Sequence, residues 1–518
     1  LGDVYKRQAE LLALGQQEDS SEEDGFSMTV LGLRTSSFRN GVSSLHGEVA
    51  REMWQDLWAK SLVSEVPIRG LTNGVHASTW VAKEMSDLYA RYIDVRWIDR
   101  SGDASMWTSV YDIPDGELWK VHEERRRLMV ERIRDGVRIK MPHHIAEAER
   151  QSAHELLHPH VLTIGFARRF ATYKRSDLLF RNIERLIRIL QHAERPVQIV
   201  IAGKAHPRDV AGKEMMHRII RALQQYGLER RVVFVEDYDM DVAKVLVKGV
   251  DVWLNTPRRP YEASGTSGMK AAINGVLHWS ILDGWWAEAY GGNNGFAIGR
   301  GEDYADADEQ DMVESDILYH MLENLIAPMF YERDESGVPR AWVAMMKHSI
   351  ATNAGRFSSH RMVHEYMNEC YMPAARLAAQ LCDDNASAAI ALHAWKSELR
   401  DVWQGVHIRD LRIIDTDDVY IGKRIRVRVQ LESSHIALTH IRVELCHGIL
   451  DAKGLIPSPS YHTMRIVEHE NTHRAILETE YECTESGKQG VAVRAMPVHP
   501  HVPFAHDLQL MSFVEHEA

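Results

Sequence analysis

The sequence predicts an α/β fold that contains a doubly wound parallel sheet and ends in an antiparallel β-sandwich. Short β-branched runs alternate with amphipathic helical runs between Val161 and Leu254, a pattern typical of a parallel sheet with helices on both faces. After Ile408 the hydrophobic period changes to two, as in half-buried antiparallel strands. The chain has 518 residues. We therefore expect about three domains, because one domain usually holds about 150 residues.

The expected elements of the sheet follow one another along the central part of the chain. Four short apolar runs are expected to be buried strands, at residues 161–166, 197–202, 232–235 and 250–254, and helical spacing fills residues 177–191, 215–223 and 242–247. In such sheets ligands bind beyond the carboxyl ends of the strands. We therefore expect the chemistry in the loops that begin at Ala167, Gly203, Glu236 and Asn255.

The flanking segments predict the remaining domains. Residues 28–160 are mixed, with a strand-like run at 29–33, a helix near 45–57 and a charged helical run at 117–138, whereas residues 317–381 are mostly helical. The expected division is an irregular leader at 1–27, which is a candidate for a non-native segment, the remainder of an N-terminal domain with its crossover at 28–160, the sheet domain at 161–355, a returning helical segment at 356–405 and a β-sandwich at 406–518.

Composition excludes several classes of protein. The content of 45% hydrophobic and 26% charged residues is typical of a globular chain. The net charge of −13 disfavours nucleic acid and anionic membranes as partners, and no apolar run reaches the roughly 18 residues that cross a bilayer. The four cysteines form no C-x-x-C pair, so we expect neither a disulfide framework nor a zinc site. A cytoplasmic protein is the expectation, and a homo-oligomer remains open.

A cluster of cations follows the first predicted strand. The run Gly165–Arg175 contains Arg168, Arg169, Lys174 and Arg175. Guanidinium groups present forked donors to phosphate oxygens, and a lysine adds a mobile charge. The run therefore predicts an anion site at the carboxyl edge of the sheet; the alternative is a solvated basic surface. The second loop, Gly203–Pro207, repeats the pattern more weakly through its lysine and histidine.

The fourth loop, Glu262–Gly275, carries the strongest signal. Small, hydroxyl-bearing residues precede a predicted helix, which favours a phosphate cradle made of free backbone N–H groups. Lys270 stands one turn into that helix among apolar neighbours. Partial desolvation would lower the pKa of its amine and suit it to forming an imine with an aldehyde. The alternative is an ordinary surface helix with an exposed lysine.

The same loop weakens one enzyme class without excluding it. Nucleotide-sugar glycosyltransferases with two facing Rossmann-like domains often place two glutamates eight positions apart here. In this chain the two positions hold Glu262 and Lys270. A residue that would hold a donor ribose has therefore become a candidate cofactor anchor.

With these motifs in place, the chain resembles the C-terminal part of an α-glucan (glycogen, starch or maltodextrin) phosphorylase. Glu262–Lys270 resembles the family motif E-A-S-G-T-x-x-M-K, and Arg169–Lys174 resembles R-x-x-x-Y-K. Two intervening loops match at Gly203-Lys204 and at Glu236-Asp237-Tyr238, and the similarity extends upstream to Asn40-Gly41-Val42 with His46 and to Leu71–His76. His76 fits the short bacterial and archaeal branch best.

The resemblance implies an architecture, a cofactor and a set of roles. The architecture is the two-domain Rossmann-like glycosyltransferase (GT-B) fold, with the first domain incomplete, the second complete and a β-sandwich added. The cofactor is pyridoxal 5′-phosphate, and no metal is expected. The implied roles are Lys270 as the cofactor anchor; Arg168, Thr266 and Ser267 at the cofactor phosphate; Tyr238 at its ring; Arg169 and Lys174 at the substrate phosphate; Glu262, Ser264 and Gly265 at the glucosyl hydroxyls; and His76 at the transferred sugar.

The implied reaction is reversible phosphorolysis of an α-1,4-glucan by a hexosyltransferase. Inorganic phosphate attacks the non-reducing end of a glucan or maltodextrin and releases glucose 1-phosphate with retention, while the cofactor phosphate relays a proton. Two alternatives stay open: a nucleotide-sugar-dependent glucosyltransferase of glycogen-synthase type, and a non-catalytic glucan-binding protein. No glycine-rich segment of the family type precedes Met28, so we expect this chain by itself to be weakly active or inactive.

Two further groups of residues receive a structural interpretation. His154, His158 and His160 suggest a metal site at first sight, but no carboxylate or cysteine stands in register with them. We expect a cluster at a helix end. Trp279, Trp285 and Trp286 are expected to belong to the core and not to form sugar platforms.

Overall fold

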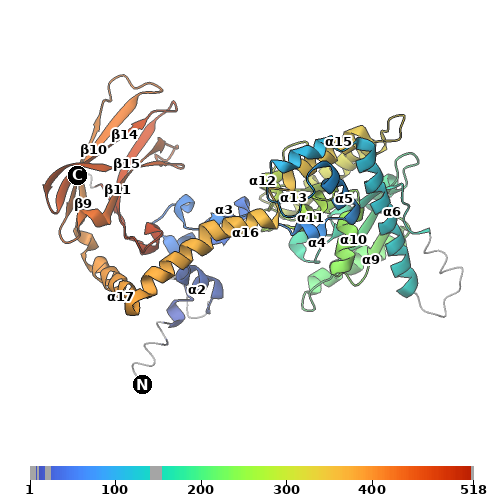
Figure 1. Ribbon diagram of the computed structural model, residues 1–518, viewed down its shortest axis with the longest axis horizontal. Helices are drawn as coiled ribbons and strands as arrows, with labels where there is room; N and C mark the ends of the chain where they lie inside the picture. Colours follow the sequence, from blue (N-terminus) through green and yellow to red (C-terminus); the bar gives the residue numbers. More distant parts are fainter. Residues whose placement is uncertain (1–7, 9–10, 18–24, 141–154, 515–518) are drawn as a thin grey trace. The chain divides into compact units, whose positions relative to one another are not determined.

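The computed structural model describes residues 8, 11–17, 25–140 and 155–514 (Figure 1). The chain forms two compact units. One, called here the sheet unit, comprises Asn40–Val49 and Arg69–Met367; the other, called the sandwich unit, comprises Leu1–Arg39, Ala50–Ile68 and Asn368–Ala518. Each unit is described by itself. The predicted domain limits, which follow the chain continuously, stay a prediction.

The sheet unit is built on a six-stranded parallel sheet with the order β5-β4-β3-β6-β7-β8. The strands are β3 (Leu162–Ala167), β4 (Val197–Ala202), β5 (Val232–Val235), β6 (Val252–Asn255), β7 (Leu277–Ile281) and β8 (Phe296–Ile298). Residues in β3, β4, β6 and β7 are all buried, as expected of strands covered on both faces. The predicted parallel sheet is therefore confirmed, and two strands beyond the predicted four extend it.

The sheet unit also contains helices, most of which pack around the sheet (Figure 1). They are α4 (Ala77–Trp80), α5 (Lys83–Tyr92), α6 (Asp115–Lys140), α8 (Ile183–Leu190), α9 (Val210–Gln225), α10 (Met240–Gly249), α11 (Ser267–Ala272), α12 (Trp286–Ala289), α13 (Ala307–Met321), α14 (Ala327–Tyr331), α15 (Arg340–Asn353) and α16 (Ser359–Tyr366), with α3 (Ser44–Met53) beginning in this unit. A short parallel pair, β1 (Asn40–Gly41) and β2 (Arg69–Gly70), joins two upstream segments. The helix expected at 177–191 is interrupted, because Asn182 caps α8 through Arg185 N.

One predicted element in the upstream segment is wrong. The strand-like run at 29–33 lies in helix α2 (Met28–Thr35). Ser27 caps this helix by accepting a hydrogen bond from Val30 N at 3.4 Å, and Val30 is its one buried residue in the described part of the chain. A five-residue apolar run does not distinguish a strand from a helix by periodicity, and here the cap favours the helix.

The sandwich unit confirms the predicted antiparallel sheets. One has the order β13-β14-β10-β9 and the other β12-β11-β15-β16. Their strands are β9 (Val406–Ile414), β10 (Arg424–Ser433), β11 (Ile441–Ile449), β12 (Ser460–Thr463), β13 (Arg465–Asn471), β14 (Arg474–Glu482), β15 (Gln489–Pro497) and β16 (Ser512–Phe513). Burial alternates along β10, so its inward side chains form a core with residues of the facing sheet such as Leu445 and Val493.

The α-helices of the sandwich unit precede its strands. The longest is α17 (Met372–Val402), within which Asp383–Ala386 depart from helical backbone angles. Arg494 of β15 pairs with Glu65 at 2.5 Å and with Glu444 at 2.8 Å, which ties residues 50–68 to the strands. Among the described residues no helix is long and apolar enough to span a bilayer.

Candidate functional site

The predicted site residues of the sheet unit gather at the carboxyl ends of neighbouring strands. β3 and β6 are parallel neighbours, so the loops that follow them adjoin at one edge of the sheet. The first loop contains Arg168 and Lys174, and the second contains Glu262 and the start of α11. Residues almost a hundred positions apart are thereby brought together.

Glu262 is the centre of this cluster. Its Oε2 atom lies 2.7 Å from Arg168 Nη2 and 2.5 Å from Lys174 Nζ. Burial by itself would raise the pKa of the Glu262 carboxyl, but the charges of Arg168 and Lys174 outweigh burial and hold that pKa below its ordinary value. The carboxylate is therefore ionised at neutral pH and holds both cations in place.

Two buried polar atoms beside Glu262 have no hydrogen-bond partner within the described chain. These are Arg168 Nη1 and Ser264 Oγ, in residues whose exposure is 6% each. An unsatisfied buried donor costs roughly 1–3 kcal/mol, more for a charged group. A guanidinium nitrogen and a hydroxyl left in this state suit a ligand that brings oxygen acceptors, such as an anion or a sugar.

The four cations of the first loop have separate roles. Arg168 and Lys174 contact Glu262, while Arg169 is exposed. Arg175 is buried, donating to Thr256 O and Pro257 O and pairing with carboxylates of α13. The alternative of a solvated basic surface thus fits Arg169 alone among the four.

Backbone contacts fix the loop that carries Glu262. Glu262 N donates to Asp283 Oδ2 at 2.9 Å, and Trp285 N donates to Ser264 O at 2.9 Å. Gly265 has a φ of +78°, a conformation that favours glycine. Burial raises the pKa of Asp283 to about 6. Both of its oxygens accept backbone N–H groups, so this carboxyl fixes the loop of Glu262.

Lys270 projects from α11 into a half-buried position beside an aromatic ring. Its Nζ lies 3.9 Å from the centre of the Trp80 ring. Burial lowers the pKa of this amine, and no carboxylate in the described part of the chain is within ion-pair distance of it. An ammonium on an aromatic face is stabilised by the ring quadrupole, while the neutral amine loses little on burial. The alternative of an exposed surface lysine is therefore wrong.

Asn274 and Trp80 complete the surroundings of Lys270, and the sequence did not point to either. Asn274 Oδ1 accepts from Ala82 N at 2.7 Å, and its Nδ2 donates to Trp80 O at 2.9 Å and to Lys270 O at 2.8 Å. One buried amide thus joins the helix of Lys270 to the segment that carries the ring. A polar residue after the apolar run Ala271–Ile273 was the signal that could have identified it.

The remaining predicted cofactor residues lie at the same edge. Thr266 O accepts from Lys270 N at 3.3 Å, and Ser267 Oγ accepts from Trp253 Nε1 at 3.1 Å. Tyr238 is half-buried, and burial raises the pKa of its phenol against the opposing charge of Arg168. α11 has six residues, so we assign the binding of negative charge to the cations and not to this short helix.

The structure does not bring His76 into contact with these residues. Its ring is exposed, and Nδ1 lies 2.8 Å from Thr79 Oγ1 on the same helix. His76 precedes α4, the helix that ends at Trp80. Its role at the transferred sugar stays a prediction.

The tryptophans and histidines that were not assigned to a binding site lie in the core or near the surface. Trp279, Trp285 and Trp286 are at most 1% exposed and belong to the core, as predicted. The rings of His158 and His160 lie 5.5 Å apart, while His154 lies outside the described residues. Within residues 25–140 and 155–514, no group of three or more possible ligands is placed to hold a metal ion.

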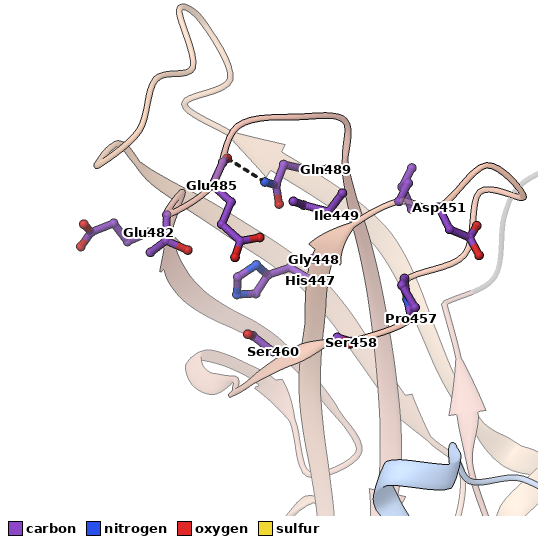
Figure 2. Close-up of a pocket in the computed structure, with 12 residues that line it drawn as sticks. His447, Gly448, Ile449, Asp451, Pro457, Ser458, Ser460, Glu482, Glu485 and Gln489 are labelled. Carbon is purple, nitrogen blue, oxygen red and sulfur yellow. Dashed lines mark hydrogen bonds between the residues drawn. The ribbon is translucent and has the colours of Figure 1, made fainter. Parts of the chain in front are cut away.

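A hollow of about 270 Å³ lies in the sandwich unit, lined by the end of β11, the loop after it and the turn between β14 and β15 (Figure 2). His447 forms its floor, stacked on Tyr481 at 4.1 Å, and Figure 2 shows Glu485 pointing toward this ring. Among the described residues that line it, none is a lysine or arginine, and none is a tryptophan, tyrosine or phenylalanine. It therefore lacks both the cations that a phosphate requires and the flat aromatic face that commonly supports a sugar.

Comparison with known proteins decides the family. The family model for carbohydrate phosphorylases matches residues 5–335. The chain belongs to the carbohydrate phosphorylase family. A second model, for the glycogen phosphorylase C-terminal domain, matches residues 403–515, which covers the β-sandwich. The resemblance stated from the four loop motifs is confirmed.

Individual phosphorylases are similar over most of this chain. A maltodextrin phosphorylase from Thermococcus litoralis is 37% identical over 99% of the chain and 60% of the relative. A glycogen phosphorylase from Aquifex aeolicus is 44% identical over 70% of the chain and 51% of the relative, and one from Mycobacterium tuberculosis is 34% identical over 97% and 58%. The chain thus spans about half to three fifths of the length of these phosphorylases.

Proposed function

We propose that this chain carries the cofactor and phosphate side of an α-glucan phosphorylase, which transfers a glucosyl group from the non-reducing end of an α-1,4-glucan to inorganic phosphate. The product is glucose 1-phosphate, formed reversibly and with retention. The observation that carries the proposal is the cluster around Glu262, in which a carboxylate holds Arg168 and Lys174. The helix that follows the loop of Glu262 carries the half-buried Lys270. This arrangement offers an amine anchor, two ordered cations and a sugar-binding carboxylate together.

The residues present fit pyridoxal 5′-phosphate. The amine of Lys270 has a lowered pKa and no carboxylate partner among the described residues, which suits it to hold the aldehyde end of the cofactor. Arg168 Nη1 is buried and has no hydrogen-bond partner among the residues that the structure describes, and with Thr266 and Ser267 it would receive the phosphate. Tyr238 would approach the ring. When bound, the phosphate of the cofactor supplies the proton relay.

The residues assigned to the substrate are those with hydrogen-bond donors or acceptors still free within the described chain. An ammonium group has three donors, so Lys174 retains two beyond the one given to Glu262. With the exposed Arg169 it would bind inorganic phosphate. Glu262, Ser264 and Gly265 would bind the glucosyl hydroxyls, because the carboxylate and the unpaired Ser264 hydroxyl can each accept from a sugar. His76 is retained as a candidate contact to the transferred sugar.

The wider assignments belong to the same proposal. The sheet unit would contribute the second Rossmann-like domain of a GT-B architecture, with residues 28–160 belonging in part to the first. The chain would act in the cytoplasm on glycogen or maltodextrin, and its oligomeric state is left open. The half-buried Lys270 at the position of a glutamate disfavours a nucleotide-sugar transferase, because a lysine cannot supply the two carboxylate oxygens that accept hydrogen bonds from the hydroxyls of a ribose.

Chemical trapping tests this proposal. Pyridoxal phosphate is added to the purified chain, the adduct is reduced with borohydride, and labelled peptides are located by mass spectrometry. We expect the label at Lys270. Lys248 is the internal control, because burial lowers the pKa of its amine as well; equal labelling of both lysines would indicate reactivity without a site.

A variant completes the test. Lys270→Ala is expected to abolish the label while leaving the thermal unfolding midpoint close to that of the unchanged protein. If the chain without substitutions is folded and takes up no label, the proposed cofactor site is contradicted and the nucleotide-sugar alternative is favoured.

A further inference from the structure

Two buried side chains lie side by side under the first turn of α11. β6 and β7 pair in parallel with Trp253 opposite His278, so both side chains point to the same face of the sheet. Each is 0% exposed. Neither residue belongs to a sequence motif or to the predicted site.

Trp253 determines how the hydroxyl of Ser267 is used. Its indole Nε1 lies 3.1 Å from Ser267 Oγ. An indole N–H can only donate, so Ser267 Oγ is the acceptor in this bond. The hydroxyl proton of Ser267 thus remains available to donate to a ligand.

His278 determines how closely α11 approaches the sheet. A β-carbon added to Gly268 would lie 2.5 Å from Cε1, 2.7 Å from Nδ1 and 2.8 Å from Nε2 of His278. The imidazole edge therefore touches the second residue of the helix, and only glycine fits there. The ring has little freedom to yield, because its centre lies 5.2 Å from that of Trp285 and 4.8 Å from that of Trp286.

The imidazole is neutral in this position. Burial, with the charge of Arg168 as a smaller cause, lowers the pKa of His278 to about 3. Its two ring nitrogens are buried and have no hydrogen-bond partner within the described chain. The backbone of Trp253 lies near enough to the ring to oppose part of this lowering of the pKa. The closest approach of the imidazole to the helix is at Gly268.

We propose that Trp253 and His278 are positioning residues that set the height and start of α11, and through it the location of the Lys270 amine over the Trp80 ring. The inference rests on the proposed function, since it deepens the cofactor site. Lys270 lies two residues beyond Gly268 in a helix of six residues. A displacement at the first turn is therefore carried directly to Lys270.

Complementary substitutions test the contact. Gly268→Ala should lower the affinity for pyridoxal phosphate by about tenfold or more, because the new methyl group meets a ring that cannot move aside. His278→Ala alone should have a smaller effect. The double variant Gly268→Ala/His278→Ala should bind within about threefold of His278→Ala, because the space left by the ring accepts the methyl group. Gly116→Ala is the matched control, since nothing lies within 4 Å of a β-carbon there.

Two readouts separate this inference from the proposed function. The first is cofactor affinity with the trapped Lys270 peptide. The second is the acetylation rate of Lys270 relative to Lys248, which needs no cofactor and reports the surroundings of the amine. We expect the relative rate to change in Gly268→Ala and to return in the double variant.

Each outcome decides the matter. If the chain without substitutions binds no pyridoxal phosphate, the proposed function is contradicted. The acetylation rates of Lys270 in the variants then still test the positioning role. If the double variant remains as impaired as Gly268→Ala in both readouts, the positioning role is wrong. It is also wrong if the substitutions alter thermal stability alone, since the contact would then serve folding only.

Discussion

Arg168 and Arg175 stand seven positions apart in one loop and show what separates a binding cation from a structural one. Each nitrogen of Arg175 has a partner: Nε and Nη2 donate to two backbone carbonyls, Nη1 pairs with Asp311 at 2.9 Å, and Nη2 also pairs with Glu314 at 2.5 Å. Arg168 has one carboxylate partner, Glu262, and a second nitrogen with no partner among the described residues. Both arginines are buried, so the difference lies in the number of acceptors that surround each.

The comparison teaches that unfilled hydrogen-bond capacity marks the site better than charge does. A buried arginine whose three nitrogens all have protein acceptors holds its neighbours in place and leaves little donor capacity for a ligand. An incompletely bonded one is held in place by its carboxylate and can still bind an anion.

The largest effect on stability is expected at Arg175. Arg175→Met should lower the free energy of unfolding by about 3–5 kcal/mol, because it leaves Glu314 buried without its cation and two buried carbonyls without their donor. Asp311 keeps Arg181 and Arg258 as partners. Denaturant titration measures this. The exposed Arg169→Met is the control and should change the free energy by less than about 0.5 kcal/mol. A similar small loss for Arg175→Met would break the comparison.

The next effect concerns binding at Arg168. Arg168→Met should weaken pyridoxal phosphate by about tenfold to a hundredfold, the usual value of a hydrogen bond to a charged group. Binding of pyridoxal, which lacks the phosphate, should hardly change. Absorbance titration with the two compounds measures the ratio. If both weaken equally, Arg168 does not face the phosphate.

Glu262 supplies a prediction about pH. Its pKa is lower in the folded protein than in the unfolded chain, so its contribution to stability is present above its unfolded pKa, near 4.5, and is lost as the pH falls through the folded value. The difference in unfolding free energy between the unchanged protein and Glu262→Gln should therefore be constant above about pH 6 and shrink below about pH 4.5. A difference that grows on acidification would show that Arg168 and Lys174 do not stabilise the carboxylate.

The smallest effect is expected at Lys270. Burial lowers the pKa of its amine in the folded state, so the folded protein releases this proton before the unfolded chain does. Relative to Lys270→Met, the unchanged protein should gain stability as the pH rises through the lowered value toward 10.5. Thermal unfolding between pH 7 and 10 measures the trend. The opposite slope would place the amine beside an anion.

Much of the site could be predicted from sequence because its motifs are continuous. Glu262–Lys270 and Arg168–Lys174 each occupy one loop, and the alternation of strands and helices places those loops at the same edge of the sheet. Trp80, Asn274 and the pair Trp253 and His278 were missed. Their importance depends on contacts between segments far apart in the chain, and neither spacing nor residue type reveals such contacts.

Local patterns therefore determined the parallel sheet, the β-sandwich, the family and the loops that hold the chemistry, since hydrophobic period and motif spacing are properties of neighbouring residues. Only the tertiary structure decided that, of the four cations in the first loop, Arg168 and Lys174 pair with Glu262, Arg175 is bonded through each nitrogen and Arg169 is exposed. It also decided that the amine of Lys270 rests on an aromatic ring and that run 29–33 is a helix. The reason is physical: ion pairing and burial depend on distances through space, which the fold sets.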